Sequence, residues 1–324
     1  MTSIVVYALA VVLAVVAVRW WLVLREQAPP AFEPFEGAVY RVGEAAVLER
    51  TSKDPRVTVV CMHGFLENIG YFLPVYAGPE VQLILISSAG YHTPGAATVP
   101  AWARPVAGDP GTIEYDAAVL VQALEHLPRT SRVRVHGHSR GGAVVLEASM
   151  LRPDLFEKAE VVLEAPVLPG GTPRTPIAGV ALWMLPFLIP LWRMQPISKR
   201  NLATWGQLDN ADKRRVISAL PFNPRRISTM LVNLRSIKAW SERDDAKRLS
   251  AVRGVVLVPG DDQVLDPATM AASAERAGQK LQIVRIPDAS HFVSYDVPAL
   301  VDLNAPRPAG EPRDDAAMAT SAGA

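Results

Sequence analysis

The pentapeptide GHSRG at residues 137–141 is the feature that most constrains what this chain can fold into. A β-type run at 133–136 precedes it, and a helix-like run from Gly141 to Leu151 follows. A strand that turns directly into a helix through a glycine-framed serine holds the hydroxyl at the apex of a strained turn. Gly137 and Gly141 fit because strand and helix pass too closely there for a Cβ. We therefore expect Ser139 to be a nucleophile.

The N-terminus is a second strong signal, because Ile4–Val18 is unbroken apolar sequence that resumes after Arg19. At ~1.5 Å per residue, residues 4–24 are long enough as a helix to cross a bilayer of about 30 Å. Trp20 and Trp21 suit the interfacial belt, and Arg19 can extend toward the headgroups. We expect a single uncleaved transmembrane anchor at residues 1–26.

A cleaved signal peptide is the competing interpretation of this segment. It is disfavoured because no basic residue precedes Ile4 and no small-x-small cleavage site precedes Pro29. Arg19 and Arg25 follow the apolar run, so the positive-inside rule places the rest of the chain in the cytoplasm.

After the anchor, short apolar β-type runs alternate with helix-length segments. Such alternation predicts βαβ units, right-handed crossovers and a mostly parallel sheet covered by helices on both faces. Residues 39–48 are expected to form an edge hairpin. The other expected strands are 57–62, 81–87, 133–136, 161–165, 255–258 and 281–286, and the expected helices are 112–127, 141–151 and 268–279.

The alternation stops at residues 167–249, which we interpret as an inserted helical cap. Residues 177–194 are almost continuously apolar, but Pro186 and Pro190 interrupt them, so a straight membrane span is not expected. The cap is expected to cover the site, supply an acyl pocket or touch the bilayer. An ordinary pair of core helices is the alternative for the apolar part, and the basic residues that follow, Lys213 among them, are expected to be a solvated face.

Composition sets the remaining boundaries. Residues 27–36 carry three prolines and are expected to form a stiff linker. Residues 37–166 and 250–303, which carry the strand–helix alternation, are the expected core domain. Residues 304–324 are expected to be a disordered tail. Lys and Arg number 33 against 32 Asp and Glu, a net charge of +1 that argues against a nucleic-acid partner. The single Cys61 lies in an apolar run and is expected to be buried.

A serine nucleophile needs a base, and the base needs a third group to fix its tautomer. His291 follows the expected strand 281–286 through a short loop, which places it at the carboxyl edge where such sheets gather their sites. Asp262 follows the preceding strand and is the preferred acid, with Asp261 left open. Asp266, next to Pro267, is expected to be a helix N-cap. His136 and His138 flank the serine and are expected to serve in packing or hydrogen bonding.

Acyl chemistry also needs donors for a developing oxyanion. The backbone amide of Arg140, directly after Ser139, is one candidate. The other is the amide of Phe65, because His63-Gly64 follows a strand and lets the chain turn toward the serine.

The order Ser139, Asp262, His291, with the H-G-F loop and the helical insertion, resembles the α/β-hydrolase superfamily over about residues 39–302. The resemblance implies an eight-stranded, mostly parallel sheet, a Ser-His-Asp triad, no metal or other cofactor, and acyl-enzyme chemistry. Two departures are visible. The loop at 88–95 lacks the glycine-rich pattern of many relatives, and one residue separates Gly260 from Asp262 where two are common.

We therefore expect a membrane-anchored serine hydrolase that acts on a small-molecule or lipid ester, preferably one with a hydrophobic acyl group. Thioesterase, amidase, acyltransferase and perhydrolase activities would keep the same serine. A non-catalytic, membrane-tethered scaffold with a hydrolase fold is the alternative from another class.

Overall fold

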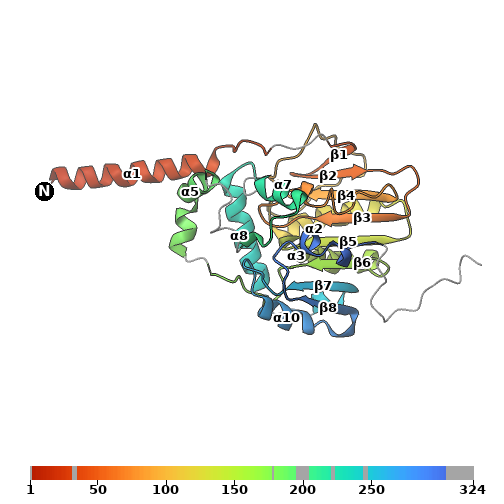
Figure 1. Cartoon of the computed structure of the whole chain (residues 1–324). Coiled ribbons are helices and arrows are strands. Elements are labelled where there is room, and N and C mark those ends of the chain that lie inside the picture. Colours follow the sequence, from red (N-terminus) through yellow and green to blue (C-terminus); the bar gives the residue numbers. More distant parts are fainter. Residues whose placement is uncertain are drawn as a thin grey trace, which may run out of the picture.

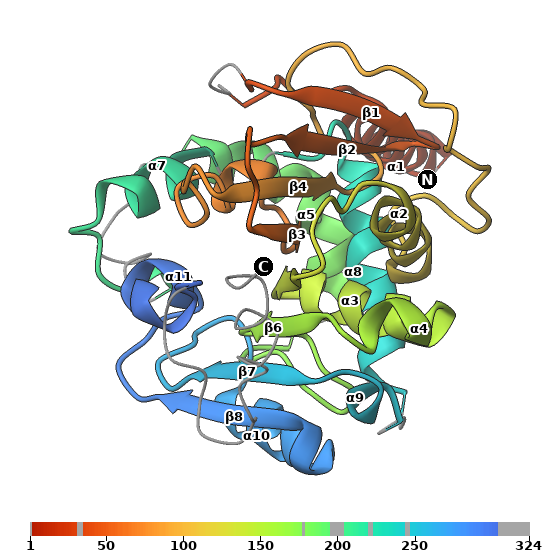
Figure 2. The ribbon, with the colours of Figure 1, turned by 90° about the vertical axis from the view of Figure 1, so that its right-hand side faces the viewer.

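The computed structural model describes residues 2–30, 35–176, 179–194, 204–219, 223–243 and 247–303. Its centre is one eight-stranded sheet in the order β1-β2-β4-β3-β5-β6-β7-β8 (Figures 1 and 2). Every pairing from β4 to β8 is parallel, whereas β1 pairs with β2, and β2 with β4, in antiparallel fashion. The strands are β1 (Ala38–Val42), β2 (Ala45–Arg50), β3 (Val57–Met62), β4 (Val81–Ser87), β5 (Val133–His138), β6 (Glu160–Glu164), β7 (Gly254–Pro259) and β8 (Leu281–Ile286).

The expected edge hairpin and the mostly parallel sheet are both confirmed. Continuous burial explains the continuous hydrophobicity of the central strands, because β3 and β4 are buried along their whole length. Cys61 lies inside β3 and is buried and free, as expected.

Helices cover both faces of the sheet. Helices α2 and α3 pack on one face, and the short α11 lies on the other (Figure 2). Thr112 begins α2 by accepting a hydrogen bond from the amide of Tyr115, and Asp266 likewise caps α10 through the amide of Thr269. These core helices are α2 (Ile113–His126), α3 (Arg140–Leu151), α4 (Pro153–Phe156), α10 (Pro267–Glu275) and α11 (Val293–Asp296).

The described part of the segment between β6 and β7 is mainly helical after residue 178. It contains α5 (Gly179–Arg193), α7 (Ala211–Ala219), α8 (Ile227–Ser241) and α9 (Lys247–Ser250). Both Pro186 and Pro190 lie inside α5. Most of α5 is exposed, so the alternative of an ordinary core helix does not describe it.

A 23-residue helix, α1 (Thr2–Leu24), projects from the domain (Figure 1). Residues Ser3–Leu24 are long and apolar enough to cross a membrane. The helix ends against the domain, because Leu22 and Val23 are buried. The expected tail at 304–324, and residues 31–34 of the expected linker, lie outside the described residues.

The register of the parallel strands brings several loops together. Met62 pairs with Gly137, His138 with Glu164, and Pro259 with Ile286. The chain therefore leaves β3, β5, β6, β7 and β8 at a common carboxyl edge, where a site in such a sheet is expected.

Candidate active site

Ser139 occupies the sharp turn between β5 and α3. Its φ of 53° and ψ of −119° lie in a region that residues other than glycine rarely adopt. A Cβ on Gly137 would lie 2.5 Å from the carbonyl oxygen of Gly141, and one on Gly141 would lie 2.0 Å from that of Met62. Both positions therefore require glycine, and the strained turn that the pentapeptide predicts is present.

Neighbouring strands hold this turn by its backbone. The amide of Ser139 donates to the carbonyl of Glu164 at 2.9 Å, and the carbonyl of Ser139 accepts from the amide of Val167 at 3.0 Å. These bonds tie the turn to the end of β6. They offset part of the cost of the unusual φ.

His291 and Asp262 meet in the loops that follow β8 and β7. The Nδ1 of His291 lies 2.7 Å from Oδ2 of Asp262, and both side chains are almost completely buried. The other carboxylate oxygen accepts from the amides of Val264 at 2.7 Å and Leu265 at 3.0 Å. Burial alone would raise the pKa of Asp262, but His291 and these two amides lower it below its ordinary value. Asp262 is thus held as a carboxylate that fixes the orientation of His291.

Asp261, the alternative acid, points elsewhere. It is exposed, and its carboxylate accepts from the side-chain amide of Gln263 at 3.2 Å. The geometry therefore favours Asp262 as the partner of His291.

No hydrogen bond joins Ser139 to His291 within the described part of the chain, although both residues lie at the same edge. The two residues are linked through His138, which precedes Ser139. Its ring centre lies 4.8 Å from that of His291, and its Nε2 donates to the His291 carbonyl at 2.8 Å. Catalytic hydrogen bonds of this kind often become short only in the complex with substrate.

The loop after β3 lies over the serine. A Cβ on Gly64 would lie 2.9 Å from the Cβ of Ser139. The amide of Gly64 donates to Glu67 Oε2 at 2.6 Å, and the amide of Leu66 donates to the Tyr91 hydroxyl at 3.1 Å. The amide of Phe65, between them, has no partner among the described groups. It is therefore the amide of this loop that remains able to bind an oxyanion.

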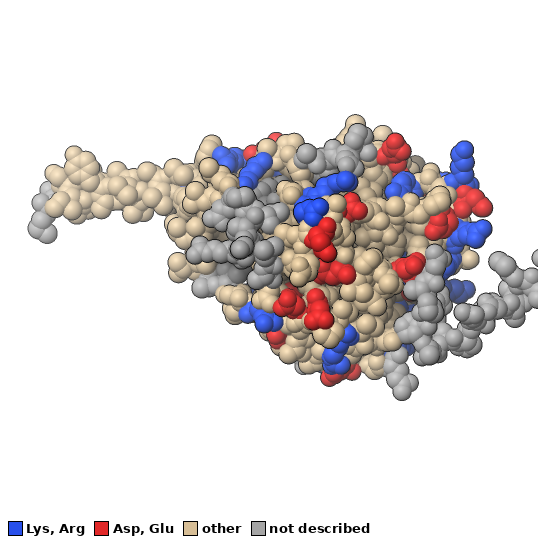
Figure 3. Space-filling model, viewed as in Figure 1, with Lys and Arg blue, Asp and Glu red and all other residues tan. Residues whose placement is uncertain are grey.

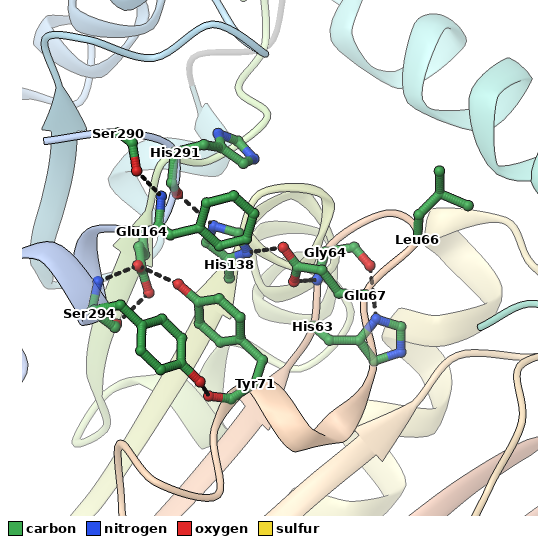
Figure 4. A network of polar contacts seen from close by, with 12 residues as sticks. His63, Gly64, Leu66, Glu67, Tyr71, His138, Glu164, Ser290, His291 and Ser294 are labelled. Carbon is green, nitrogen blue, oxygen red and sulfur yellow. Dashed lines mark hydrogen bonds and ion pairs between the residues drawn. The ribbon is translucent and has the colours of Figure 1, made fainter. Parts of the chain in front are cut away.

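A network of buried charges that sequence reasoning did not find joins His138, the residue before Ser139, to Glu67 and surrounds Glu164 (Figure 4). The Nδ1 of His138 forms an ion pair with Oε1 of Glu67 at 2.7 Å. Burial opposes the charge on His138, but the carboxylates of Glu67 and Glu164 raise its pKa to about 9. The charged His138 thus links the loop at Gly64 to the backbone of His291.

Glu164, at the end of β6, is the second buried carboxylate of this network. It accepts from the Tyr71 hydroxyl and from the amide and hydroxyl of Ser294, each at 2.6 Å, and pairs with His136 at 2.9 Å. Burial would raise its pKa, but His138 and His136 lower it to about 2. The only sequence signal for this network was the position of His136 and His138 beside the serine, because their partners are far away along the chain.

Arg140 contributes more than its amide. Its guanidinium is fully buried and forms an ion pair with Asp116 of α2 at 2.8 Å. It also donates to the Gly111 carbonyl at 2.9 Å. Asp116 in turn accepts from the amide of Ala89 at 3.1 Å. This pair therefore anchors the loop after β4, the same loop that departs from the glycine-rich pattern.

The expectation of a solvated basic face is wrong for Lys213. This side chain of α7 is buried, forms an ion pair with Asp296 and donates to the Ser290 hydroxyl at 3.2 Å. Asp296 also accepts from the amide of Ser290 at 2.8 Å. The ammonium is buried because a carboxylate and a hydroxyl surround it, and it ties α7 to the loop that carries His291.

Among the described residues, no cluster of three or more His, Cys, Asp or Glu side chains is arranged to hold a metal ion. The site is thus a buried serine, a histidine–aspartate pair and a free backbone amide at one edge of the sheet. That arrangement is suited to acyl transfer.

Comparison with known proteins finds one matching family and many solved structures of similar fold. The model of a family described as "Alpha/beta hydrolase family" matches residues 59–302. No curated protein matches the chain. Solved structures with a similar fold include an esterase from Exiguobacterium antarcticum, with 15% identity, a TM-score of 0.56 and coverage of 81% of this chain and 94% of that one.

Two further structures have the same fold. A lipase-esterase related protein from Clostridium acetobutylicum has 14% identity and a TM-score of 0.54, covering 80% of this chain and 97% of that one. A deformylase of N-formylmaleamic acid from Pseudomonas putida has 15% identity and a TM-score of 0.56, with coverage of 81% and 96%.

Proposed function

Because the chain belongs to the alpha/beta hydrolase family, we propose that it is a membrane-anchored serine hydrolase that cleaves carboxylic esters through an acyl-enzyme. The observation that carries this proposal is the 2.7 Å contact between His291 and Asp262 at the sheet edge where Ser139 sits on its strained turn. The esterase-like structural neighbours support the same class of reaction.

In the proposed mechanism, Oγ of Ser139 attacks the ester carbonyl carbon while Nε2 of His291 accepts the hydroxyl proton. Asp262 already occupies Nδ1, so it fixes the tautomer and stabilises the imidazolium that forms. Collapse of the tetrahedral intermediate breaks the bond to the alcohol, which leaves with the proton from His291. Water, activated by His291, then attacks the acyl-enzyme and releases the acid and free Ser139.

The negative charge on the carbonyl oxygen needs fixed donors throughout. We assign them to the amides of Phe65 and Arg140. Glu67 and Tyr91 engage the amides on either side of Phe65, which supports the choice of that residue. Arg140 is the first residue of α3, so its amide has no partner four residues earlier in the helix.

The burial of Leu22 and Val23 supports a retained anchor over a cleaved signal peptide. The amide of Gln27 also donates to the Arg225 carbonyl at 2.6 Å, so the chain just after α1 is fastened to the domain. Removal of α1 would expose this contact surface. We retain a cytoplasmic location for the domain as part of the proposal, from the positions of Arg19 and Arg25.

Hydrolysis of p-nitrophenyl esters of increasing chain length tests the proposal. We expect turnover by the wild type and a fall in kcat/KM of roughly 10⁴-fold or more for Ser139→Ala, because the nucleophile is lost. A folded wild-type protein that cleaves no ester in the series would support the scaffold alternative. Turnover that survives Ser139→Ala would show that another residue is the nucleophile.

A further inference from the structure

Helix α5 is unusual because it is apolar on every side. Leu182, Leu185 and Ile189, at helical spacing, pack inward in a cluster with α8 and with Val23 of α1. The outward side is apolar too. We call this outward side the outer face of α5, and it consists of Val180, Trp183, Met184, Leu188, Leu191 and Trp192, which are between 36% and 77% exposed.

A helix that is hydrophobic all round is normally buried in a core or in a membrane. An exposed apolar patch of this kind marks a contact surface with another apolar partner. At ~1.5 Å per residue, the 15 residues of α5 reach only about 22 Å, too short to span a bilayer. A helix of this length can instead lie in the plane of the membrane–water interface.

The position of α1 identifies the partner. Nε of Arg19 donates to the Trp183 carbonyl at 3.2 Å, and the guanidinium lies 5.4 Å from the centre of the Trp183 ring. An arginine at the end of a membrane span is expected at the level of the headgroups. If α1 spans a bilayer, Trp183 and the start of α5 therefore lie at its surface.

Helix α5, the end of α1 and the carboxyl edge of the sheet lie at the same end of the domain (Figure 1). In Figure 1, α5 lies beside the end of α1, at the end of the domain from which α1 projects, and runs across the direction of α1. Residues 2–18 of α1 contain no charged side chain, and none is visible on the face of the projecting helix in Figure 3. The arrows of β6 and β7 point toward the same end of the domain, so the carboxyl edge that carries the site faces it.

The inward side of α5 connects this surface to the site. Phe65 and Leu66 pack against the same cluster as Leu182, Leu185 and Ile189. Phe65 carries the proposed oxyanion amide, and Gly64 before it adjoins Ser139. Apolar side chains thus extend from the outer face of α5 to the loop over the nucleophile.

We propose that the outer face of α5 lies in the lipid interface beside α1, and that the site takes amphiphilic esters directly from that bilayer. This inference rests on the membrane-anchored serine hydrolase proposed above. It deepens that function by naming the substrate source and the surface that receives it.

The single buried cysteine allows a direct test. Leu191→Cys in the full chain can be labelled with an environment-sensitive fluorophore, because Cys61 is only 1% exposed. Leu151→Cys is the matched control, since Leu151 is a 49% exposed leucine at the end of α3 far from the carboxyl edge. Leu13→Cys reports on α1. The labelled proteins are reconstituted in phosphatidylcholine vesicles that contain a nitroxide-labelled lipid.

We expect the lipid nitroxide to quench the probes at positions 191 and 13. Each should be quenched several-fold more than the control probe at position 151. A water-exposed probe at 191 beside a quenched probe at 13 would overturn the inference. A probe at 191 that is shielded only at high protein density, without lipid quenching, would assign the outer face to a second copy and also overturn it.

Activity gives a second readout. We expect Leu191→Asp to lower the ratio of turnover on a vesicle-borne ester to turnover on a water-soluble ester by roughly tenfold, because the variant would place a charge in the lipid interface. Leu151→Asp should leave that ratio unchanged, and equal ratios for both variants would contradict the inference. Labelling of Ser139 by a fluorophosphonate is independent of α5, so it shows separately whether the proposed function itself has failed.

Discussion

Two regions of the molecule depart from the usual burial of apolar side chains and exposure of charged ones, and they do so in opposite ways. At the carboxyl edge of the sheet, charged groups such as Glu67, His138 and Glu164 are buried. At the α1 and α5 surface, large apolar groups such as Trp21 and Leu191 are exposed. Charged residues are rarely buried without partners, and large apolar patches are rarely exposed without a function.

The difference lies in where the missing partner is found. The buried charges have theirs within the chain, at 2.7 Å between His138 and Glu67 and at 2.9 Å between His136 and Glu164. The apolar surface is left exposed by the described residues, and the proposal above supplies a bilayer to cover it. The buried charges are therefore paired within the folded chain, whereas the apolar surface would be covered only in a membrane.

The largest effect is expected where the buried region orients the proposed base. Asp262→Asn should reduce kcat roughly 10⁴-fold, because an amide would stabilise the wrong tautomer of His291. Ester hydrolysis measures this effect. Asp261→Asn is the matched control and should change kcat less than about twofold, so equal losses in the two variants would contradict the assignment of Asp262.

The next prediction compares how much a buried and an exposed ion pair contribute to the free energy of unfolding. Glu67→Gln should lower the free energy of unfolding by about 3–5 kcal/mol, because it leaves His138 without its counter-charge. Glu275→Gln breaks an ion pair with Arg285 in which both side chains are more than half exposed, and should cost less than about 1 kcal/mol. Urea unfolding compares the two, and similar losses would remove the distinction between buried and exposed pairs.

Two truncated chains test whether the last turn of α1 stabilises the domain. A chain that begins at residue 19 lacks most of α1 but should keep its fold, because it still contains the buried Leu22 and Val23. A chain that begins at residue 27 should be less stable than the first by about 2–5 kcal/mol, since both contacts are lost. Equal stability of the two chains would mean that α1 is not fastened to the domain.

The smallest predicted effect is the pH dependence of the charged network. The pKa of His138 is raised to about 9 from an ordinary 6.5, so the pair stabilises the fold fully below about pH 6.5. That contribution falls as the pH rises through about 9. Urea unfolding from pH 6 to 9.5 should show a steeper loss for the wild type than for Glu67→Gln, and parallel curves would contradict the charged state of His138.

The sequence predicted the parts of the fold that depend on local pattern. The strands, the edge hairpin and the glycines around Ser139 follow from hydrophobic runs and from steric limits within a few residues. The Glu67–His138 pair could not be predicted in this way, because 71 positions separate its members. Only the register that brings β3 beside β5 makes them neighbours.

The same reason explains the error at Lys213. In the sequence it belongs to a basic, helix-like stretch, which usually forms a solvated surface. Its partner Asp296 lies 83 positions away, after the last strand. The docking of Val23 against α5 and α8 was equally invisible, because the apolar run by itself indicates a membrane span and says nothing about what its last turn contacts.

The central claim is that Ser139 is the nucleophile of a serine hydrolase, and the most direct test is covalent labelling. The full-length protein is treated with a fluorophosphonate, and the modified peptide is identified by mass spectrometry, with Ser139→Ala as control. We predict one adduct, on Ser139, that the variant lacks. A correctly folded protein that remains unlabelled, or that carries the adduct on another residue, would contradict it.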